Sequence, residues 1–347
     1  MPLIATRKLT PFVAAIFRAY DVPSAIARTV AESLVLANLK GHDSHSVQRV
    51  VQYLDWMQRG WINPRGKLRV VRDKPSLLLV EGGFQFGQVI GRQATAMAIR
   101  KAKRAGVCVL TIRRSAHLGR MGEFAEMAAA AGLVYFSFTN THGGGLCVAP
   151  YGGRERRLSA NPLAAGAPMP GGTPIIMDMA TAAIADGKVS VAKAKGERLP
   201  PGCVVDARGK MTTDPNDYYG DPPGALLPFG GHKGFALSVF ADIFAGALSG
   251  AGCSKIGVDR VANAMLALVL DPRVLAGRRF YDREVKAFAR HVKSCPRRNG
   301  VEEILLPGAP EEREFARRKR EGIPIPESTW IALVQAAREK GVVSASR

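Results

Sequence analysis

The chain has 347 residues, of which 47% are hydrophobic and 22% are charged, and its formal net charge is +20 at pH 7. This composition is typical of a globular protein with two or three domains, and no apolar run reaches the ~18 residues that a membrane-spanning helix requires. Lys and Arg are spread along the whole chain and alternate with Glu in the densest run, residues 313–321, so the charge is typical of solvated helix faces and we expect no nucleic-acid partner.

The first sixty residues show the spacing of helices. Thr10 and Pro11 have the pattern of a capping residue followed by a first-turn proline. Two apolar stripes at helical spacing follow, and each ends at a glycine. The stripe before Gly41 consists of Ile26, Val30, Leu34 and Ala37, and the stripe before Gly60 consists of Val47, Val50, Val51 and Leu54.

From about residue 68 the pattern changes to short strands that alternate with helices. We expect strands at 67–71, 76–82, 107–112, 133–138, 173–180 and 264–271. We expect helices at 92–104, from about 121, at 233–250 and, with a cap near Ser328, at 326–341. Residues 199–231 are rich in Pro, Gly and Asp, so we expect a long ordered loop there, and loops of that length tend to be functional.

The cysteines and the common cofactor fingerprints narrow the class of site. The five cysteines form no C-x-x-C pair, which indicates reduced thiols, a cytoplasmic location, and neither a disulfide framework nor a zinc site. The first twelve residues lack the apolar core of a secretory signal. Neither G-x-G-x-x-G nor G-x-x-x-x-G-K-[ST] occurs, which argues against a Rossmann turn and a P-loop.

His117 is the first candidate for chemistry. It lies between the predicted strand 107–112 and the predicted helix near Met121. The positive end of a helix dipole disfavours an imidazolium, so the ring there would be neutral, as a general base requires. A turn histidine that only bonds the backbone is the alternative, and this stretch alone leaves both interpretations open.

The loop GHDSHSVQR offers a second group of candidates, His42, Ser44, His45 and Arg49. We expect Arg49 one turn into a helix, where its guanidinium could hold a carboxylate through two parallel hydrogen bonds. The H-x-x-H pair lacks the further ligands of a closed metal site, so we expect no metal. An ordinary polar loop between helices is the alternative.

The stretch GGHKGFALS, residues 230–238, is a glycine-rich entry into a helix. Free backbone N–H groups at such a helix start, together with Lys233, suit a phosphate group. The alternative is a flexible connection. The second glycine-rich stretch, THGGGLCVAPYGG, brings the backbone close to a ligand or only forms a turn.

Taken together, these stretches resemble the malate/lactate/ureidoglycolate dehydrogenase family, which is unrelated to the Rossmann-type lactate and malate dehydrogenases. The resemblance spans nearly the whole chain and is closest to the hydroxycarboxylate dehydrogenase branch. It is carried by the ordered motifs GHDSHSVQRV, SAHLGRMGEFAEMAAAAGL, VAPYGG, NPLAAGAP, MDMATAAIADGKV, LPPGCVVDARGKMTTDP, GGHKGFALSVFADIFAGALSGA and LLPGAPEEREFARRKREGIPIPESTW.

The resemblance implies an NAD(P)-dependent oxidoreductase that transfers a hydride between nicotinamide and a small 2-oxo or 2-hydroxy carboxylic acid of the malate or lactate type. It implies an α+β fold in which a mostly antiparallel central sheet, not a Rossmann fold, binds NAD or NADP. Both chain ends would form a helical part, residues 1–70 packing with 295–347, around a cofactor-binding sheet domain, residues 71–294. The family forms homodimers.

The resemblance also implies roles for single residues. His117 corresponds to the acid–base histidine, and Arg49 to the arginine that grips the substrate carboxylate, with His45 beside it. The positions that line the cofactor are Thr141, Asp178, Met179, Ala180, Lys233 and Gly234.

The choice between NAD and NADP remains open at this point. Asp186 could bond a ribose 2′-hydroxyl and repel a 2′-phosphate, whereas the surplus of Lys and Arg favours that phosphate.

Two positions depart from the family pattern. Ser46 stands where the family has Gly, which would strain the backbone if that position needs a positive φ. Ala160 stands where the family has Thr, so a hydroxyl near the substrate is lost. Together with the net charge of +20, these departures motivate one alternative to the main function, a catalytically impaired binding protein on the same scaffold. The other alternative is a reductase of cyclic 2-imino acids such as piperideine- or pyrroline-2-carboxylate, because the GGHKG element also resembles that of such reductases.

Overall fold

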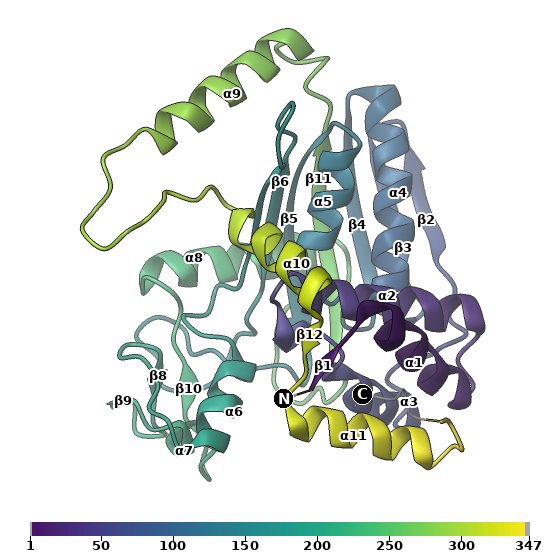
Figure 1. Cartoon of the computed structure of the whole chain (residues 1–347), viewed down its shortest axis with the longest axis vertical. Coiled ribbons are helices and arrows are strands. Elements are labelled where there is room, and N and C mark those ends of the chain that lie inside the picture. The colour runs from purple at the N-terminus through teal and green to yellow at the C-terminus, as the bar shows by residue number, and fades with distance from the viewer. Residues whose placement is uncertain (1, 344–347) are drawn as a thin grey trace.

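A seven-stranded sheet lies at the centre of the computed structural model, which describes residues 2–343 (Figure 1). Residues 1 and 344–347, at the ends of the two predicted helical parts, lie outside the described residues. The strand order is β2-β3-β4-β11-β5-β6-β7. The strands are β2 (Arg69–Lys74), β3 (Leu77–Glu81), β4 (Val107–Ser115), β5 (Val134–His142), β6 (Leu163–Ala167), β7 (Ile175–Met179) and β11 (Ala262–Leu270).

The predicted α+β class is confirmed, and the sheet is mixed. Strands β3 and β4 run parallel, because α4 (Gly87–Ala105) connects them as a crossover helix. The other neighbouring pairs of this sheet run antiparallel.

Different helices cover the two faces of the sheet. Helices α4 and α5 (Gly122–Ala130) pack on one face, where Tyr135 belongs to the same buried core as Phe124. Side chains alternate along a strand, so the neighbouring Phe136 and Phe138 point to the opposite face. There Phe138 contacts Phe244, with ring centroids 5.0 Å apart, on the π-helix η2 (Asp242–Ala247) that continues α8 (His232–Ala241).

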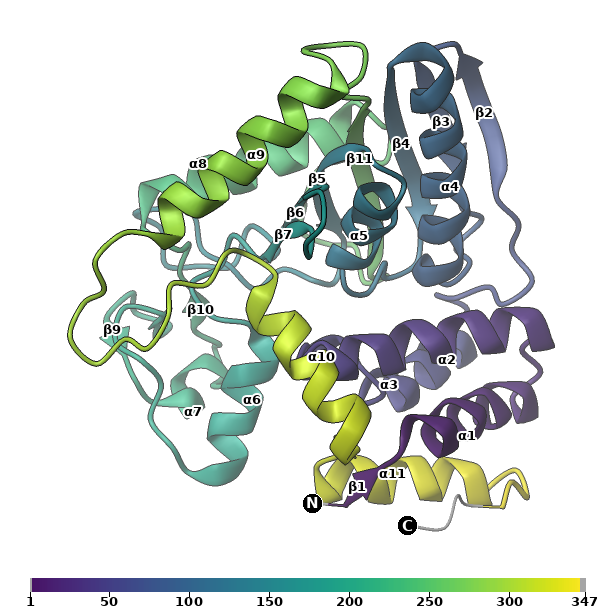
Figure 2. The same cartoon turned by 45° about the horizontal axis from the view of Figure 1, so that its top comes forward.

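Both chain ends build one helical layer at one end of the sheet (Figure 2). Its helices are α1 (Thr6–Ala19), α2 (Ser24–Leu39), α3 (Arg49–Gln58), α10 (Ala309–Glu321) and α11 (Glu327–Arg338). Phe12 of α1 and Trp330 of α11 pack with ring centroids 5.6 Å apart in a common core. Strand β1 (Leu3–Ile4) also pairs antiparallel with β12 (Ile323–Pro324), so the two ends are joined by backbone as well as by side chains.

The segment 199–231, expected as a long loop, contains short elements of its own. They are β8 (Val204–Val205), β9 (Met211–Thr212), α7 (Pro215–Tyr218) and β10 (Ala225–Leu226), and the three strands form a small second sheet. Together with α6 (Asp186–Lys195), they form a lobe beside the helical layer (Figure 1). The elements are too short to show a period of 2 or 3.6 in the sequence.

Other local predictions were wrong. Helix α1 begins at Thr6, not at Thr10, because the burial of Leu9 and Phe12 stabilises the earlier turn, and Pro11 therefore lies inside the helix. Helix α11 begins at Glu327 after Pro326 instead of at a cap near Ser328.

Val51, expected on a buried helix face, is 42% exposed because α3 turns it away from the buried Val50. The 16-residue helix α9 (Arg278–Lys293) was not expected at all. Among residues 2–343, no helix combines the length and the apolar character needed to cross a membrane.

Candidate active site

Three segments bring the predicted catalytic residues into one place. The loop between β4 and α5 carries His117, the 3-10 helix η1 (Asp43–His45) ends with His45, and Arg49 is the first residue of α3. The rings of His45 and His117 stack with centroids 5.4 Å apart and 21° between their planes. Because α3 begins at Arg49, this residue lies at the helix start and not, as expected, one turn into the helix.

Both histidines of this group are neutral at pH 7. Burial, followed by the positive charge of Arg49, lowers the pKa of His117 to about 3. Burial also lowers the pKa of His45, and the neighbouring His117 and Arg49 lower it further. The neutral ring was predicted from the dipole of the following helix, whereas burial is the main cause in the structure.

Hydrogen bonds to neighbouring residues hold the Arg49 side chain. Its Nε donates to the Ser44 carbonyl oxygen over 2.7 Å, and its Nη1 donates to Gln52 Oε1 over 2.7 Å. The Ser44 hydroxyl lies 2.9 Å from His45 Nδ1, so the arginine and the histidine share one support. Within the described chain, Arg49 Nη2 has no hydrogen bond or ion pair, and this edge of the guanidinium remains available to a carboxylate.

Sequence reasoning missed the residues that hold His117 from behind. Tyr53 Oη lies 2.7 Å from His117 Nδ1, and Gln88 Nε2 donates to Tyr53 Oη over 2.8 Å. Tyr53 follows Arg49 by four residues on α3, and this helical spacing is a signal that could have identified it.

Asn263 on β11 ties the His117 loop to the predicted cofactor position Thr141. Its Oδ1 accepts from the Leu118 N–H over 2.9 Å, and its Nδ2 donates to Thr141 Oγ1 over 2.8 Å. These contacts join residues more than 120 positions apart, so no local sequence pattern predicts them.

A buried polar network supports Thr141 from the other side. The Thr141 N–H donates to Asn161 Oδ1 over 3.3 Å, and Asn161 Nδ2 donates to Asp242 Oδ2 over 2.8 Å and to Ser238 Oγ over 3.0 Å. Asn161 has a φ of +32° and is fully buried, so these bonds hold it in a conformation that few residue types tolerate. Sequence reasoning did not single out Asn161 or Asp242.

The predicted cofactor positions on β7 do not share one surface. Asp178 faces α5, where its Oδ2 accepts from the Gly122 N–H over 2.7 Å. Burial is the main cause that raises the pKa of this carboxyl, although Arg120 acts against it. Met179 points to the opposite face of the sheet, because side chains alternate along the strand, and Ala180 follows at its end.

The glycine-rich start of α8 lies against the segment after β7. The Phe229 N–H donates to the Thr181 carbonyl over 3.0 Å, and a Cβ added at Gly234 would lie 2.5 Å from Phe229 O and 2.8 Å from Thr181 O. Gly234 is therefore needed for this close backbone approach. Gly231, with φ +61°, takes a conformation that other residues rarely adopt.

We expected free N–H groups at this helix start, and this is wrong for two of its three glycines, Gly230, Gly231 and Gly234. The Gly231 N–H donates to Pro228 O and the Gly234 N–H donates to Phe229 O. Lys233 is exposed in the first helical turn. A cation at a helix N-terminus is a group that can bind a phosphate, so this helix start is compatible with a dinucleotide.

The two departures from the family pattern cause no backbone strain. Ser46 has a φ of −104°, which any residue adopts, and its hydroxyl donates to the Asp43 carbonyl over 2.6 Å. The Ala160 carbonyl accepts from Thr181 Oγ1 over 2.9 Å. The backbone strain considered for Ser46 is therefore absent.

Asp186 is already engaged within the small lobe. Its Oδ1 accepts from Tyr218 Oη over 2.8 Å and from Tyr219 Oη over 3.4 Å. The next residue, Gly187, lies against the loop that carries Ser44 and His45, since a Cβ added there would be 3.2 Å from Ser44 Cβ. Asp186, the first residue of α6, thus lies next to the loop that carries His45.

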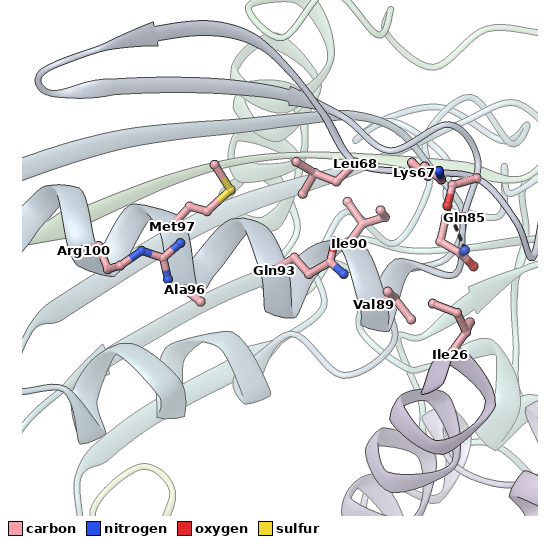
Figure 3. Close-up of a pocket in the computed structure, with 11 residues that line it drawn as sticks. Ile26, Lys67, Leu68, Gln85, Val89, Ile90, Gln93, Ala96, Met97 and Arg100 are labelled. Carbon is pink, nitrogen blue, oxygen red and sulfur yellow. Dashed lines mark hydrogen bonds between the residues drawn. The ribbon is translucent and has the colours of Figure 1, made fainter. Parts of the chain in front are cut away.

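Two surface cavities lie apart from these residues. One, of about 530 Å³, runs along α4 between Ile26, Gln85 and Arg100 (Figure 3). The other, of about 670 Å³, lies between α9, α10 and the turn after β6. None of the predicted site residues lines either cavity. Residues 2–343 contain no group of three or more His, Cys, Asp or Glu side chains that could hold a metal ion.

A family model described as malate/L-lactate dehydrogenase matches residues 4–334. The chain belongs to this family. The prediction from the motifs is confirmed, and with it the enzyme class, an oxidoreductase of 2-hydroxy acids. The chain is 40% identical over 333 residues to an L-lactate dehydrogenase of Cupriavidus necator, covering 94% of this chain and 95% of that protein. It is 35% identical over 339 residues to hydroxycarboxylate dehydrogenase B of Escherichia coli, covering 96% and 93% of the two chains.

Solved structures show the same fold. A putative malate/lactate dehydrogenase from E. coli superposes with a TM-score of 0.94 at 34% identity, covering 99% of this chain and 96% of that one. A Δ1-piperideine-2-carboxylate reductase from Pseudomonas syringae superposes with a TM-score of 0.85 at 32% identity, covering 97% and 100%.

Proposed function

We propose that the protein is an NAD(P)-dependent dehydrogenase that interconverts a small 2-oxo acid and its 2-hydroxy acid. The observation that carries this proposal is the group formed by His117, His45 and Arg49, in which a neutral imidazole lies within the field of an arginine held by its neighbours. A proton carrier next to a carboxylate grip is the pair of protein groups that this reaction requires.

In the proposed reaction, each side chain has a separate task. The free Nη2 of Arg49 binds the substrate carboxylate through a charge-assisted hydrogen bond and so orients the neighbouring C2 atom. On oxidation the neutral ring of His117 accepts the proton of the C2 hydroxyl, and on reduction the ring takes up a proton from solvent and passes it to the C2 oxygen. Lys233 and the residues around Thr141 and Met179 would hold the nicotinamide cofactor, which supplies or accepts the hydride when it is bound.

A second candidate is the reduction of cyclic 2-imino acids. It is favoured by the GGHKG element at the start of α8 and by the similarity to the reductase from P. syringae. Such a substrate carries the same carboxylate, so Arg49 would bind it in the same way, and the two candidates differ in whether C=O or C=N receives the hydride.

The deciding experiment measures oxidation of NADH and of NADPH against a panel of 2-oxo acids and cyclic imines. We expect turnover with at least one 2-oxo acid such as pyruvate or oxaloacetate. Turnover confined to the imines would select the second candidate. No turnover with either cofactor, together with salt-dependent retention on DNA, would contradict both and favour a binding protein on this scaffold. The comparison of the two cofactors also decides between NAD and NADP.

We further propose that the protein is a homodimer. The helical segment of α8 and η2, which covers one face of the sheet, presents exposed apolar side chains. Phe240 is 51% exposed, Ile243 is 42% exposed, and Leu248, which follows η2, is 60% exposed. A monomer rarely leaves such side chains together in water, and we propose a second copy of this chain as the occupant, in line with the homodimer that the family resemblance implies. Sedimentation equilibrium of the parent and of Phe240→Glu tests this, with a mass near twice 37.2 kDa expected for the parent.

The predicted cytoplasmic location and domain boundaries remain proposals. All five cysteines are free, which fits a reducing compartment. A helical part from residues 1–70 and 295–347 fits the common core of α1 and α11.

A further inference from the structure

The hydrogen bonds that link Gln88, Tyr53 and His117 determine which nitrogen of the His117 ring carries its proton. Gln88 Nε2 is a donor, and the acceptor of its bond is Tyr53 Oη, 2.8 Å away. The phenol has one hydrogen to donate, and among the described residues the other hydrogen-bond partner of Tyr53 Oη is His117 Nδ1, 2.7 Å away, so that hydrogen is directed at Nδ1. Nδ1 must therefore accept, and the proton of the neutral imidazole resides on Nε2.

The packing keeps this chain of bonds rigid. The Tyr53 side chain is 1% exposed and Gln88 is fully buried, so water does not compete for their polar atoms. The Tyr53 ring contacts Phe86 and Trp56, with centroids 5.9 and 5.8 Å away. Burial raises the pKa of Tyr53 to about 12, so the phenol keeps its hydrogen at pH 7.

We propose that Tyr53, held by Gln88, is a positioning residue that fixes His117 in the tautomer whose Nε2 carries the proton. This inference rests on the proposed role of His117 and assigns a task to a residue outside the grip and the cofactor region. In the part of the chain that the structure describes, Nε2 has no hydrogen-bond partner, so it is the ring nitrogen left for a substrate.

The fixed tautomer favours one kind of ligand at the empty side of the ring. An Nε2–H is a donor, and its natural partner is an acceptor such as the oxygen of a 2-oxo acid. A substrate hydroxyl can also accept from this N–H, but it can pass its own hydrogen to the ring only when Nε2 is unprotonated. The tautomer therefore suits the free enzyme to the 2-oxo acid, whose oxygen needs only a donor.

The test is the tautomer of His117, observed directly by ¹⁵N–¹H correlation spectroscopy of the full chain at pH 7 without substrate. We expect a protonated Nε2 and an unprotonated Nδ1 in the parent. In Tyr53→Phe, which removes the hydroxyl alone, we expect mixed tautomers and a fall in kcat of about 10- to 100-fold, as for other partners that orient an imidazole. The KM for the 2-oxo acid should change less, because Arg49 is intact.

Tyr135→Phe is the matched control, because Tyr135 is also 1% exposed but lies in the core between the sheet and α5. It should leave the tautomer and kcat unchanged. A protonated Nδ1 in the parent would overturn the proposal, and so would a parent-like tautomer and kcat in Tyr53→Phe. The tautomer is measured without turnover, so failure of this inference is distinguishable from failure of the proposed dehydrogenase activity.

Discussion

Replacing Arg49 by Lys tests the proposed carboxylate grip without removing the positive charge. Arg49 uses Nε and Nη1 to bond Ser44 O and Gln52 Oε1, both over 2.7 Å, and only this anchoring leaves Nη2 directed for a ligand. A lysine ammonium is a single point donor that cannot keep both anchors and also bind a carboxylate. We expect the loss of about 1.5–3 kcal/mol of binding free energy, the usual contribution of a hydrogen bond to a charged group.

That free energy converts to a rise in KM of about 10- to 150-fold, at 1.4 kcal/mol for each factor of ten. The retained charge still lowers the pKa of His117, so kcat should fall less than KM rises. The assay is the initial rate of reduced-cofactor oxidation against 2-oxo acid concentration at saturating cofactor. Arg59→Lys is the control, because Arg59 directly follows α3, is 57% exposed and forms an ion pair with Asp55 on that helix. A KM within twofold of the parent in Arg49→Lys would place the carboxylate elsewhere.

Three further predictions concern the proton carrier, the cofactor and acid stability. His117→Ala should lower kcat by roughly 10²–10⁴-fold with little change in cofactor affinity, and near-parental turnover at saturating substrate would remove His117 from the mechanism. Lys233→Ala should raise the dissociation constant of the reduced cofactor by several-fold to about a hundredfold, as titration would show, while the melting temperature without cofactor stays the same. An unchanged titration with a destabilised apo-protein would make this helix start purely structural. The free energy of unfolding should fall as the pH drops from about 6.5 towards 3, because the unfolded chain binds a proton that folded His117, with its lowered pKa, does not. The slope due to His117 is at most about 1.4 kcal/mol per pH unit, and urea titrations of His117→Asn at pH 4 to 8 should show a shallower decline; equal slopes would contradict the lowered pKa.

Much of the site could be predicted from the sequence because its residues lie in short ordered motifs. The strand before His117 and the helix after Met121 have clear periods, and both were located to within a few residues. The loop that carries His45 and Arg49 was identified by its polar residues between two apolar stripes.

The supporting residues could not be predicted because their partners are distant in the sequence. Asn263 bonds Leu118 across 145 positions, and Asp242 holds Asn161 across 81, so only the assembled fold brings these groups together. The prediction that the Gly231 and Gly234 N–H groups are uncovered was wrong for a related reason. Glycine permits many backbone conformations, and the sequence does not determine which carbonyl each N–H meets.

The shared core of the two chain ends has a consequence for how the protein is made. Arg49 and Tyr53 lie on α3, which packs against α11 near the end of the chain. A ribosome that has produced the first 326 residues has exposed the grip and the sheet but not Trp330 and Leu333, which complete the core beneath them. A chain that lacks α11 therefore exposes the apolar face of this helical layer to chaperones and proteases, and α3, which carries Arg49 and Tyr53, loses part of the packing that supports it.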